Sequence, residues 1–153
     1  GLFEALSENV LVKNKPLLGI CVGMQMLAEK GFEDGESNGF GWIKGEVRPI
    51  NVENNNYKIP HIGWNNLELK RNHSFIDFLK RRKKLPNTEV NAYFVHSYSF
   101  MVKEPNVELI STRYSDEITA MVGKRNILGT QFHPEKSQRF GLDFLEAFIS
   151  WEL

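Results

Sequence analysis

A short apolar run that leads directly into a helix-forming segment restricts what this chain can fold into. Residues 16–20 (Pro-Leu-Leu-Gly-Ile) have the length and apolarity of a buried parallel strand. Residues 24–30 contain good helix formers, and Gly31 predicts the end of that helix. Apolar residues at helical spacing within 2–11 predict another helix before the strand. The order helix, strand, helix indicates an α/β domain.

Extended runs dominate the rest of the chain. Strands at 42–47 and 57–62, on either side of a turn at 54–56, predict an antiparallel β region. Further strands are expected at 92–98, 107–114, 118–122 and 127–132.

Two more helices are expected. Residues 75–85 carry a basic run at 80–84, and Pro86 ends this helix. The basic run could bind phosphate or nucleic acid, but charge clusters of this size are usually solvated helix faces. The last helix, 141–151, is expected to bury an apolar face made of Leu142, Leu145, Phe148 and Ile149, with Phe144 beside them.

Composition argues for one domain and against several functions. A length of 153 residues suits a single domain, 1–153. The 19 Lys and Arg balance the 19 Asp and Glu, so no overall field attracts nucleic acid or an anionic membrane. A single cysteine allows neither an internal disulfide nor a multi-thiolate zinc site, which favours a reducing, cytoplasmic setting. We expect a soluble protein, because the sequence has no apolar run long enough to span a membrane and no secretion signal, and we expect no metal or cofactor.

The cysteine lies in the segment Gly19-Ile20-Cys21-Val22-Gly23, between the expected strand and helix. A tight strand-to-helix turn lifts a nucleophile above the sheet edge, and the flanking glycines relieve crowding. The helix dipole would lower the thiol pKa, and the N–H of Val22 would face a developing oxyanion. A small buried hydrophobe is the alternative interpretation of Cys21.

A base and its orienting acid are expected in Gly129-Thr130-Gln131-Phe132-His133-Pro134-Glu135. Residues two apart in an extended backbone face the same way, so Glu135 can lie beside the His133 ring. Glu135 would then orient the imidazole, as the acid of a catalytic triad does. The alternative is a strand-end histidine with a chance glutamate. A catalytic cysteine and histidine are typically distant in sequence, which favours a triad of Cys21, His133 and Glu135.

These two segments resemble the class I (triad) glutamine amidotransferase family, and the glutaminase subunits of imidazole glycerol phosphate synthases within it. The signatures are residues 19–25 (Gly-Ile-Cys-Val-Gly-Met-Gln) and 129–137, and further matching segments are 39–45, 59–65 and 93–98. The resemblance implies a Rossmann-like three-layer α/β fold with a mostly parallel central sheet and an antiparallel β region.

The resemblance also implies roles for single residues. Cys21 would attack the side-chain amide of glutamine and form a thioester, and His133 would protonate the departing ammonia. The glutamine pocket would include Val22, Gly23 and Gln25, together with the backbone of His96, Ser97 and Tyr98. Ammonia would pass to a β/α-barrel synthase in a heterodimer, which makes imidazole glycerol phosphate and aminoimidazole ribotide in histidine biosynthesis. The docking face for that partner would be formed by Pro60, His61, Gly63, Trp64 and Asn65.

The beginning of the chain departs from the family pattern. Family members start with strand–helix units and a Pro-Gly-x-Gly loop that supplies the second oxyanion donor, and no such motif precedes Cys21. Roughly 50 residues, the size of two strand–helix units, are therefore expected to be missing, which makes this chain the C-terminal portion of the domain. The expected consequences are an exposed sheet edge and impaired glutamine hydrolysis.

Three alternatives remain open from the sequence. The same glutaminase type could serve another synthase, for example one that aminates a surface-sugar precursor. The chain could be an inactive remnant that acts only in binding. A cysteine peptidase on a similar fold is the third, with less support because no second acid or asparagine lies near His96 to orient it.

Overall fold

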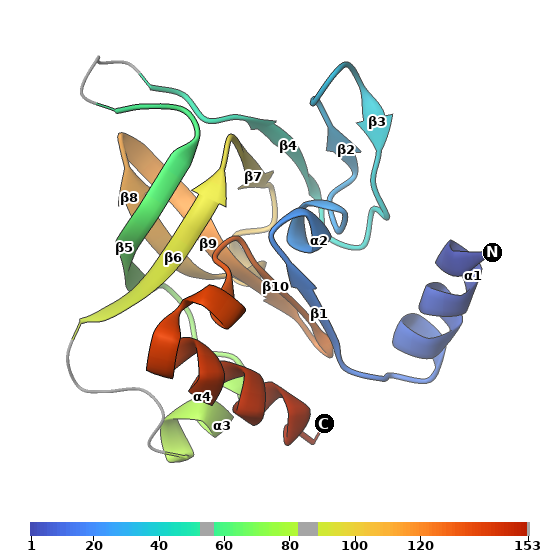
Figure 1. The fold of residues 1–153 in the computed structure, drawn as a ribbon. Coiled ribbons are helices and arrows are strands. Elements are labelled where there is room, and N and C mark those ends of the chain that lie inside the picture. The colour runs from blue at the N-terminus through green and yellow to red at the C-terminus, as the bar shows by residue number, and fades with distance from the viewer. Residues whose placement is uncertain (53–56, 83–88, 153) are drawn as a thin grey trace.

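A six-stranded sheet in the order β1-β10-β9-β8-β5-β6 forms the centre of the computed structural model, which describes residues 1–52, 57–82 and 89–152 (Figure 1). Its strands are β1 (Leu17–Ile20), β10 (Ile127–Thr130), β9 (Asp116–Lys124), β8 (Glu108–Tyr114), β5 (His61–Leu69) and β6 (Val90–His96).

The predicted α/β class is confirmed, but the described sheet is mixed instead of mostly parallel. β1 and β10 pair in parallel, whereas the four remaining pairings are antiparallel. β8, β9 and β10 follow one another through turns of one and two residues, and such short connections permit only antiparallel pairing. β1 is an edge strand in which only Gly19 is buried, so the expected full burial of 16–20 was wrong.

A second sheet has the order β3-β2-β4-β7, with β3 (Ser37–Asn38), β2 (Lys30–Gly31), β4 (Gly45–Pro49) and β7 (Tyr98–Val102). β2 pairs with β4 in parallel, and the other two pairings are antiparallel. The expected strand 92–98 is divided, because the chain bends at Ser97 and Tyr98–Val102 joins the second sheet. The sequence did not predict β7. The expected turn at 54–56 lies outside the described residues.

The helix expected at 24–30 is much shorter. α2 spans Val22–Gln25, and Lys30–Gly31 form strand β2 instead of a helix end. The loop at 39–43 folds back, and its N–H groups bind the backbone carbonyls that would accept hydrogen bonds within a longer helix. Phe40 N–H donates to Met26 (2.7 Å), Gly41 N–H to Ala28 (2.9 Å) and Ile43 N–H to Leu27 (3.0 Å).

The N-terminal helix is confirmed as α1 (Leu2–Ser7), which continues as a π-helical turn over Glu8–Val12. Short 3-10 turns occupy Pro105–Val107 and Pro134–Lys136. α3 (Ser74–Arg81) carries the described part of the basic run, and Lys80, Arg81 and Arg82 are exposed, as a solvated face requires. The expected continuation of this helix over 83–85 and the stop at Pro86 lie outside the described residues.

α4 (Gln138–Ile149) lies beside α3 on one side of the large sheet (Figure 1). Its buried residues are Gly141, Phe144 and Ala147, whereas Leu142 and Ile149 are 61% and 84% exposed. The predicted apolar face was therefore wrong for these two residues. The buried residues are three apart in sequence, with Phe144 at the centre. They form a row next to the one that was predicted from the distribution of apolar residues.

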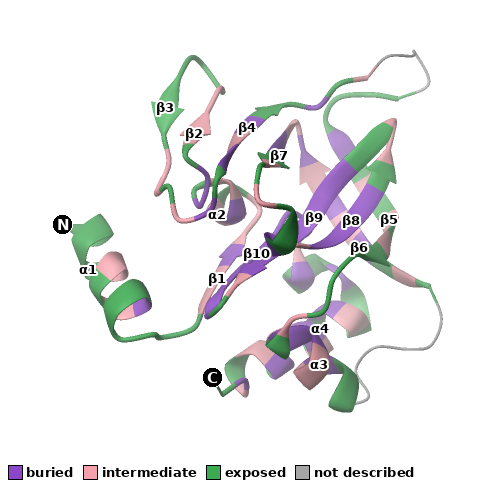
Figure 2. Cartoon of the chain, turned by 180° about the vertical axis from the view of Figure 1, so that it is seen from behind, coloured by how far each residue is buried: buried purple, intermediate pink, exposed green. Residues whose placement is uncertain are grey.

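Two apolar cores hold these layers together. The first lies between the α3–α4 pair and the large sheet and contains Phe75, Phe94, Met121, Phe132 and Phe144. The second joins α2 to β4, β7 and β9 through Met24, Leu27, Val47, Phe100 and Val122. Buried residues are concentrated along β8, β9 and β10 (Figure 2). Both cores therefore pack against β9 and β10.

Among the described helices, none has the length and apolarity needed to cross a membrane.

Candidate active site

Cys21 occupies a strained turn between β1 and α2. Its backbone has φ 52° and ψ −107°, a region that residues with side chains rarely adopt. Such strain costs about 1–3 kcal/mol and is typical of functional positions, including nucleophiles on strand-to-helix turns. The Cys21 N–H donates to the carbonyl of Thr130 at 2.7 Å, which extends the β1–β10 pairing by one residue. The sheet thus holds the cysteine beside the end of β10.

The two flanking glycines have different reasons to be glycine. A Cβ on Gly19 would overlap the backbone carbonyl of Gly23 and lie 2.8 Å from the Met24 nitrogen. A Cβ on Gly23 would meet no atom within 4 Å. The expected relief of crowding is therefore found at Gly19, whereas Gly23 borders open space.

The Cys21 thiol is half-buried and lies among polar groups. Gln131 Nε2 donates to the sulfur at 3.6 Å, and the thiol faces the carbonyl of Val95 at 3.8 Å. Burial raises the thiol pKa, and this effect exceeds the lowering by the Val22 N–H and the Gln131 amide. The expected lowering of the pKa was wrong, because a four-residue helix provides only a small dipole and burial opposes it.

His133 and Glu135 form the expected pair at the end of β10. His133 Nδ1 lies 2.6 Å from Glu135 Oε1. The His133 backbone is fixed by its N–H bond to Tyr93 O (2.9 Å) and by the Ser137 hydroxyl, which donates to His133 O (2.7 Å). Nδ1 must carry the proton when it faces a carboxylate, so Nε2 is left as the basic atom of a neutral ring.

Nε2 of His133 is buried and has no hydrogen-bond partner among the described residues. A basic nitrogen in this position is unsatisfied until a proton donor reaches it. Cys21 comes directly after β1, and His133 comes three residues after β10. Because these strands pair in parallel with Ile20 opposite Thr130, both residues lie beyond the same edge of the sheet. The thiol is hydrogen-bonded to Gln131 and Val95 in this conformation, and no hydrogen bond joins it to His133 among the described residues.

A cavity of about 130 Å³ begins at Val22, the residue that follows Cys21, and Cys21 itself is not among its lining residues. Val22 and Gln25, both expected in the substrate pocket, line it. Phe32 and Glu33 also line it and were missed by sequence reasoning. An acidic residue in a glycine-rich turn is a weak signal, because most such residues are only solvated.

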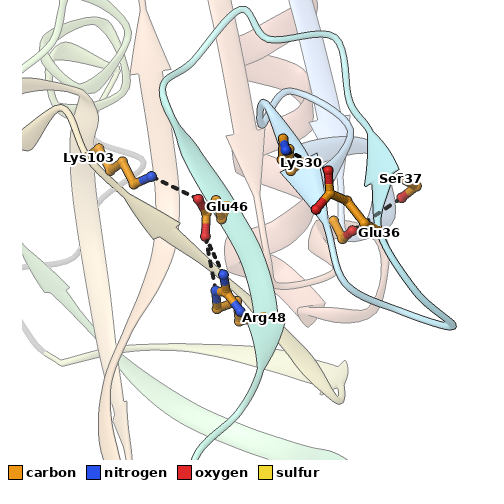
Figure 3. Close-up of polar contacts among 7 residues, drawn as sticks. Lys30, Glu36, Ser37, Glu46, Arg48 and Lys103 are labelled. Atoms are coloured by element: carbon orange, nitrogen blue, oxygen red, sulfur yellow. Dashed lines mark hydrogen bonds and ion pairs between the residues drawn. The ribbon is translucent and has the colours of Figure 1, made fainter.

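Figure 3 shows the ion pairs that Glu46 makes with Lys103 and Arg48 on the small sheet. Glu46 accepts from Lys103 Nζ (2.9 Å) and from Arg48 Nη2 (2.8 Å), and the Arg48 guanidinium lies 4.0 Å above the Phe32 ring. The hydrogen bond from Lys103, and to a smaller extent that from Arg48, hold the pKa of Glu46 below its usual value. These contacts fix the ring that forms one wall of the cavity.

The segment of His96, Ser97 and Tyr98 directly follows Val95, whose carbonyl lies 3.8 Å from the Cys21 sulfur. Two of its carbonyls have partners within the chain: Ser97 O accepts from Ile50 N–H (2.9 Å), and Tyr98 O accepts from Gln25 Nε2 (3.0 Å).

His61 does not belong to an exposed face. It is 2% exposed, its Nδ1 lies 2.9 Å from His96 Nε2, and its ring stacks on Phe94 and Tyr114. Since His96 Nδ1 lies 2.8 Å from the Tyr98 carbonyl, it must be the donor there, which makes His96 Nε2 an acceptor for His61. Burial lowers the pKa of both histidines to about 4.

The other residues of the expected docking face have mixed exposure. Trp64 is 47% exposed and Pro60 is exposed, whereas Gly63 and Asn65 are half-buried. Ile62, 57% exposed, extends the apolar surface.

The structure therefore combines a strained cysteine on a strand-to-helix turn with a His–Glu pair just beyond the adjacent parallel strand. This is the arrangement expected of a cysteine hydrolase on an α/β fold. The chain belongs to the class I glutamine amidotransferase family, whose model "Glutamine amidotransferase class-I" matches residues 2–150.

Curated relatives narrow this family. The chain is 45% identical over 152 residues to the "Imidazole glycerol phosphate synthase subunit HisH" of Brucella melitensis, covering 99% of this chain and 68% of the relative. The protein of the same name from Pelagibacter ubique is 44% identical (98% and 69%), and that from Rhodospirillum rubrum is 46% identical (99% and 68%). The chain thus spans about two thirds of the length of these relatives.

Solved structures share the fold. A glutamine amidotransferase from Thermotoga maritima superposes with a TM-score of 0.59 at 22% identity, covering 97% of this chain and 53% of that one. The glutaminase domain of a Trypanosoma brucei CTPS with bound acivicin gives 0.58 at 16% identity, with 99% and 66% covered.

Proposed function

We propose that this chain is the glutaminase part of an imidazole glycerol phosphate synthase. It hydrolyses glutamine to glutamate and ammonia and delivers the ammonia to a β/α-barrel synthase subunit in histidine biosynthesis. The observation that carries the proposal is the position of Cys21 and the His133–Glu135 pair at adjacent strand ends, in a chain 44–46% identical to subunits of that name.

The geometry supports a thioester mechanism. The Cys21 proton moves to His133 Nε2, the only ring nitrogen that Glu135 leaves free. The sulfur electron pair attacks the side-chain amide carbon, and the carbonyl pair moves onto oxygen, where the N–H of Val22 stabilises the charge. When the carbonyl reforms, the C–N bond breaks and the proton on His133 goes to the departing nitrogen, which leaves as ammonia.

Hydrolysis of the thioester repeats these steps with water. His133 takes a proton from the water molecule, and the resulting hydroxide attacks the thioester carbon. The C–S bond then breaks, glutamate leaves, and the sulfur regains its proton from His133. Glu135 stays ionised and orients the ring throughout.

The cavity lined by Val22 and Gln25 has groups that complement an amino acid. Glu33 supplies a carboxylate for the α-ammonium group, and Gln25 supplies an amide at the nucleophile end. A site built on such polar groups rejects analogues that leave the groups unpaired.

Docking to the barrel subunit is assigned to the exposed apolar end of β5. Ile62 and Trp64 face the same side of the strand, and Pro60 precedes them. Aromatic residues at the centre of an interface often dominate its binding energy. Trp64→Ala should weaken binding to the barrel by at least ~10-fold, whereas Leu69→Ala, on the same strand and equally exposed, should not. Equal dissociation constants for both variants would reject this docking face.

The activity is tested with a diazo-ketone analogue of glutamine on the chain assembled with its barrel partner. The analogue should attach to Cys21, as located by mass spectrometry of the digested protein, and added glutamine should slow the reaction. Attachment that glutamine does not slow, or the lack of any attachment while the complex still releases ammonia from glutamine, would contradict the proposal.

A further inference from the structure

Gln131 is a fully buried polar residue in contact with the sulfur of Cys21. It follows β10, its side chain is 0% exposed, and its Nε2 lies 3.6 Å from Cys21 Sγ. A buried carboxamide must find partners for both its N–H groups and its oxygen. The identity of these partners therefore decides what Gln131 presents to the thiol.

The orientation of the Gln131 amide is fixed by a chain of hydrogen bonds that starts at a backbone carbonyl. Tyr98 O can only accept, so the group of Gln25 that faces it at 3.0 Å must be the NH2 group. The same nitrogen of Gln25 donates to Gln131 Oε1 at 3.1 Å. With its oxygen directed to Gln25, Gln131 must direct its NH2 group to the sulfur.

We propose that Gln131 is a further catalytic residue, whose Nε2–H group stabilises the thiolate of Cys21 after the proton has passed to His133. The proposal rests on the proposed function in one respect, that Cys21 is the nucleophile. Gln131 keeps both its protons and forms no bond, while the electron pair stays on the sulfur until it attacks the amide carbon.

The surroundings of the thiol explain why such a donor is needed. Cys21 is half-buried, and burial disfavours the charged form of a thiol. The carbonyl of Val95, 3.8 Å from the sulfur, suits a neutral S–H group but repels a thiolate. A donor that is already in place stabilises the new charge without rearrangement of the site.

The same side chain also links the nucleophile to the cavity. Gln25 lines the cavity, and both N–H groups of its amide are bound by Tyr98 and Gln131. Its oxygen is left as the acceptor for a ligand. Loss of Gln131 should therefore raise KM for glutamine in addition to lowering the reactivity of the thiol.

The test uses the fact that Cys21 is the single cysteine of the chain, so that alkylation reports on one thiol. The rate of iodoacetamide alkylation is measured against pH for the parent, for Gln131→Met and for the control Gln138→Met. Methionine keeps the length of the side chain but has no donor, and Gln138 is exposed. For Gln131→Met the pH midpoint should rise, and the rate at pH 7 should fall about 3- to 10-fold. Gln138→Met should behave as the parent.

Should Gln131→Met fail to fold, as judged by circular dichroism, Gln131→Glu provides the same test. Its carboxylate still accepts from Gln25 but offers no N–H to the sulfur, and it should raise the midpoint further. A folded variant with the parent's midpoint would overturn the role of Gln131. That result leaves the proposed function intact if Cys21→Ala abolishes ammonia release, whereas ammonia release by Cys21→Ala would refute the proposed function itself.

Discussion

Ile20 and Thr130 are register partners in the parallel pairing of β1 with β10, and the amide of Cys21 continues this ladder by donating to Thr130 O at 2.7 Å. The pairing brings Cys21 next to a segment more than 100 residues away in sequence. His133 follows Thr130 by three residues, so the histidine and the thiol share one end of the sheet.

Replacement of the base should reduce the rate more than replacement of its orienting acid. We expect His133→Asn to lower kcat for glutamine hydrolysis by about 10²- to 10⁴-fold, because proton transfer to the leaving nitrogen is lost. Glu135→Gln should cause a smaller loss, since its amide can still hold the ring but no longer favours the charged form. Steady-state kinetics of the assembled complex provide the measurement, with the exposed Glu152→Gln as control. Equal kcat in His133→Asn and the parent would exclude His133 as the base.

Replacement of Gly19 should destabilise the fold, whereas replacement of Gly23 should not. A Cβ on Gly19 would collide with the backbone of Gly23, and Gly19→Ala should lower the free energy of unfolding by about 1–3 kcal/mol. Gly23→Ala meets open space and should change it by less than about 0.5 kcal/mol. Urea denaturation of both variants measures the difference, and similar midpoints would show that the turn is not packed as described.

The packing of α4 can be tested with two apolar residues two positions apart. Phe144→Ala removes a fully buried ring from the first core and should lower the free energy of unfolding by about 3–5 kcal/mol. Leu142→Ala should have little effect, because Leu142 is 61% exposed. A larger loss for Leu142→Ala would mean that the helix is rotated relative to the structure.

The His61–His96 pair should make the fold sensitive to acid. Both pKa values are lowered from 6.5 to about 4 by burial, so below pH 6.5 the unfolded chain binds more protons than the folded one. The stability contribution of the pair is fully present above pH 6.5 and is lost as the pH falls towards 4. Urea denaturation at pH 7 and pH 5 measures this loss, and His61→Gln should make it smaller. A loss of the same size in His61→Gln would assign the effect to other groups.

The local geometry around Cys21 and His133 was predicted from the sequence more accurately than the course of several helices and strands. The positions of Cys21, His133 and Glu135 were predicted from local patterns, a strand-to-helix turn and a two-residue spacing in extended backbone. Both patterns are reproduced at the ends of β1 and β10.

Features that depend on distant partners were not predictable. The length of the helix expected at 24–30 was overestimated, because the carbonyls of this segment bind the loop at 39–43. Local helix propensity does not predict such a contact. His61 was placed on a surface because the stacking partner Tyr114 is 53 residues away. Gln131 was overlooked since its function arises from Gln25 and Tyr98, which reach it only in the folded chain.

The central claim is that the thiol of Cys21 forms the covalent intermediate with glutamine. The most direct measurement is ammonia release from glutamine by the assembled complex of the Cys21→Ala variant. We expect a loss of roughly 10⁴-fold or more in kcat, with folding and binding to the barrel partner preserved. Ammonia release at the parent's rate by this variant would contradict the account.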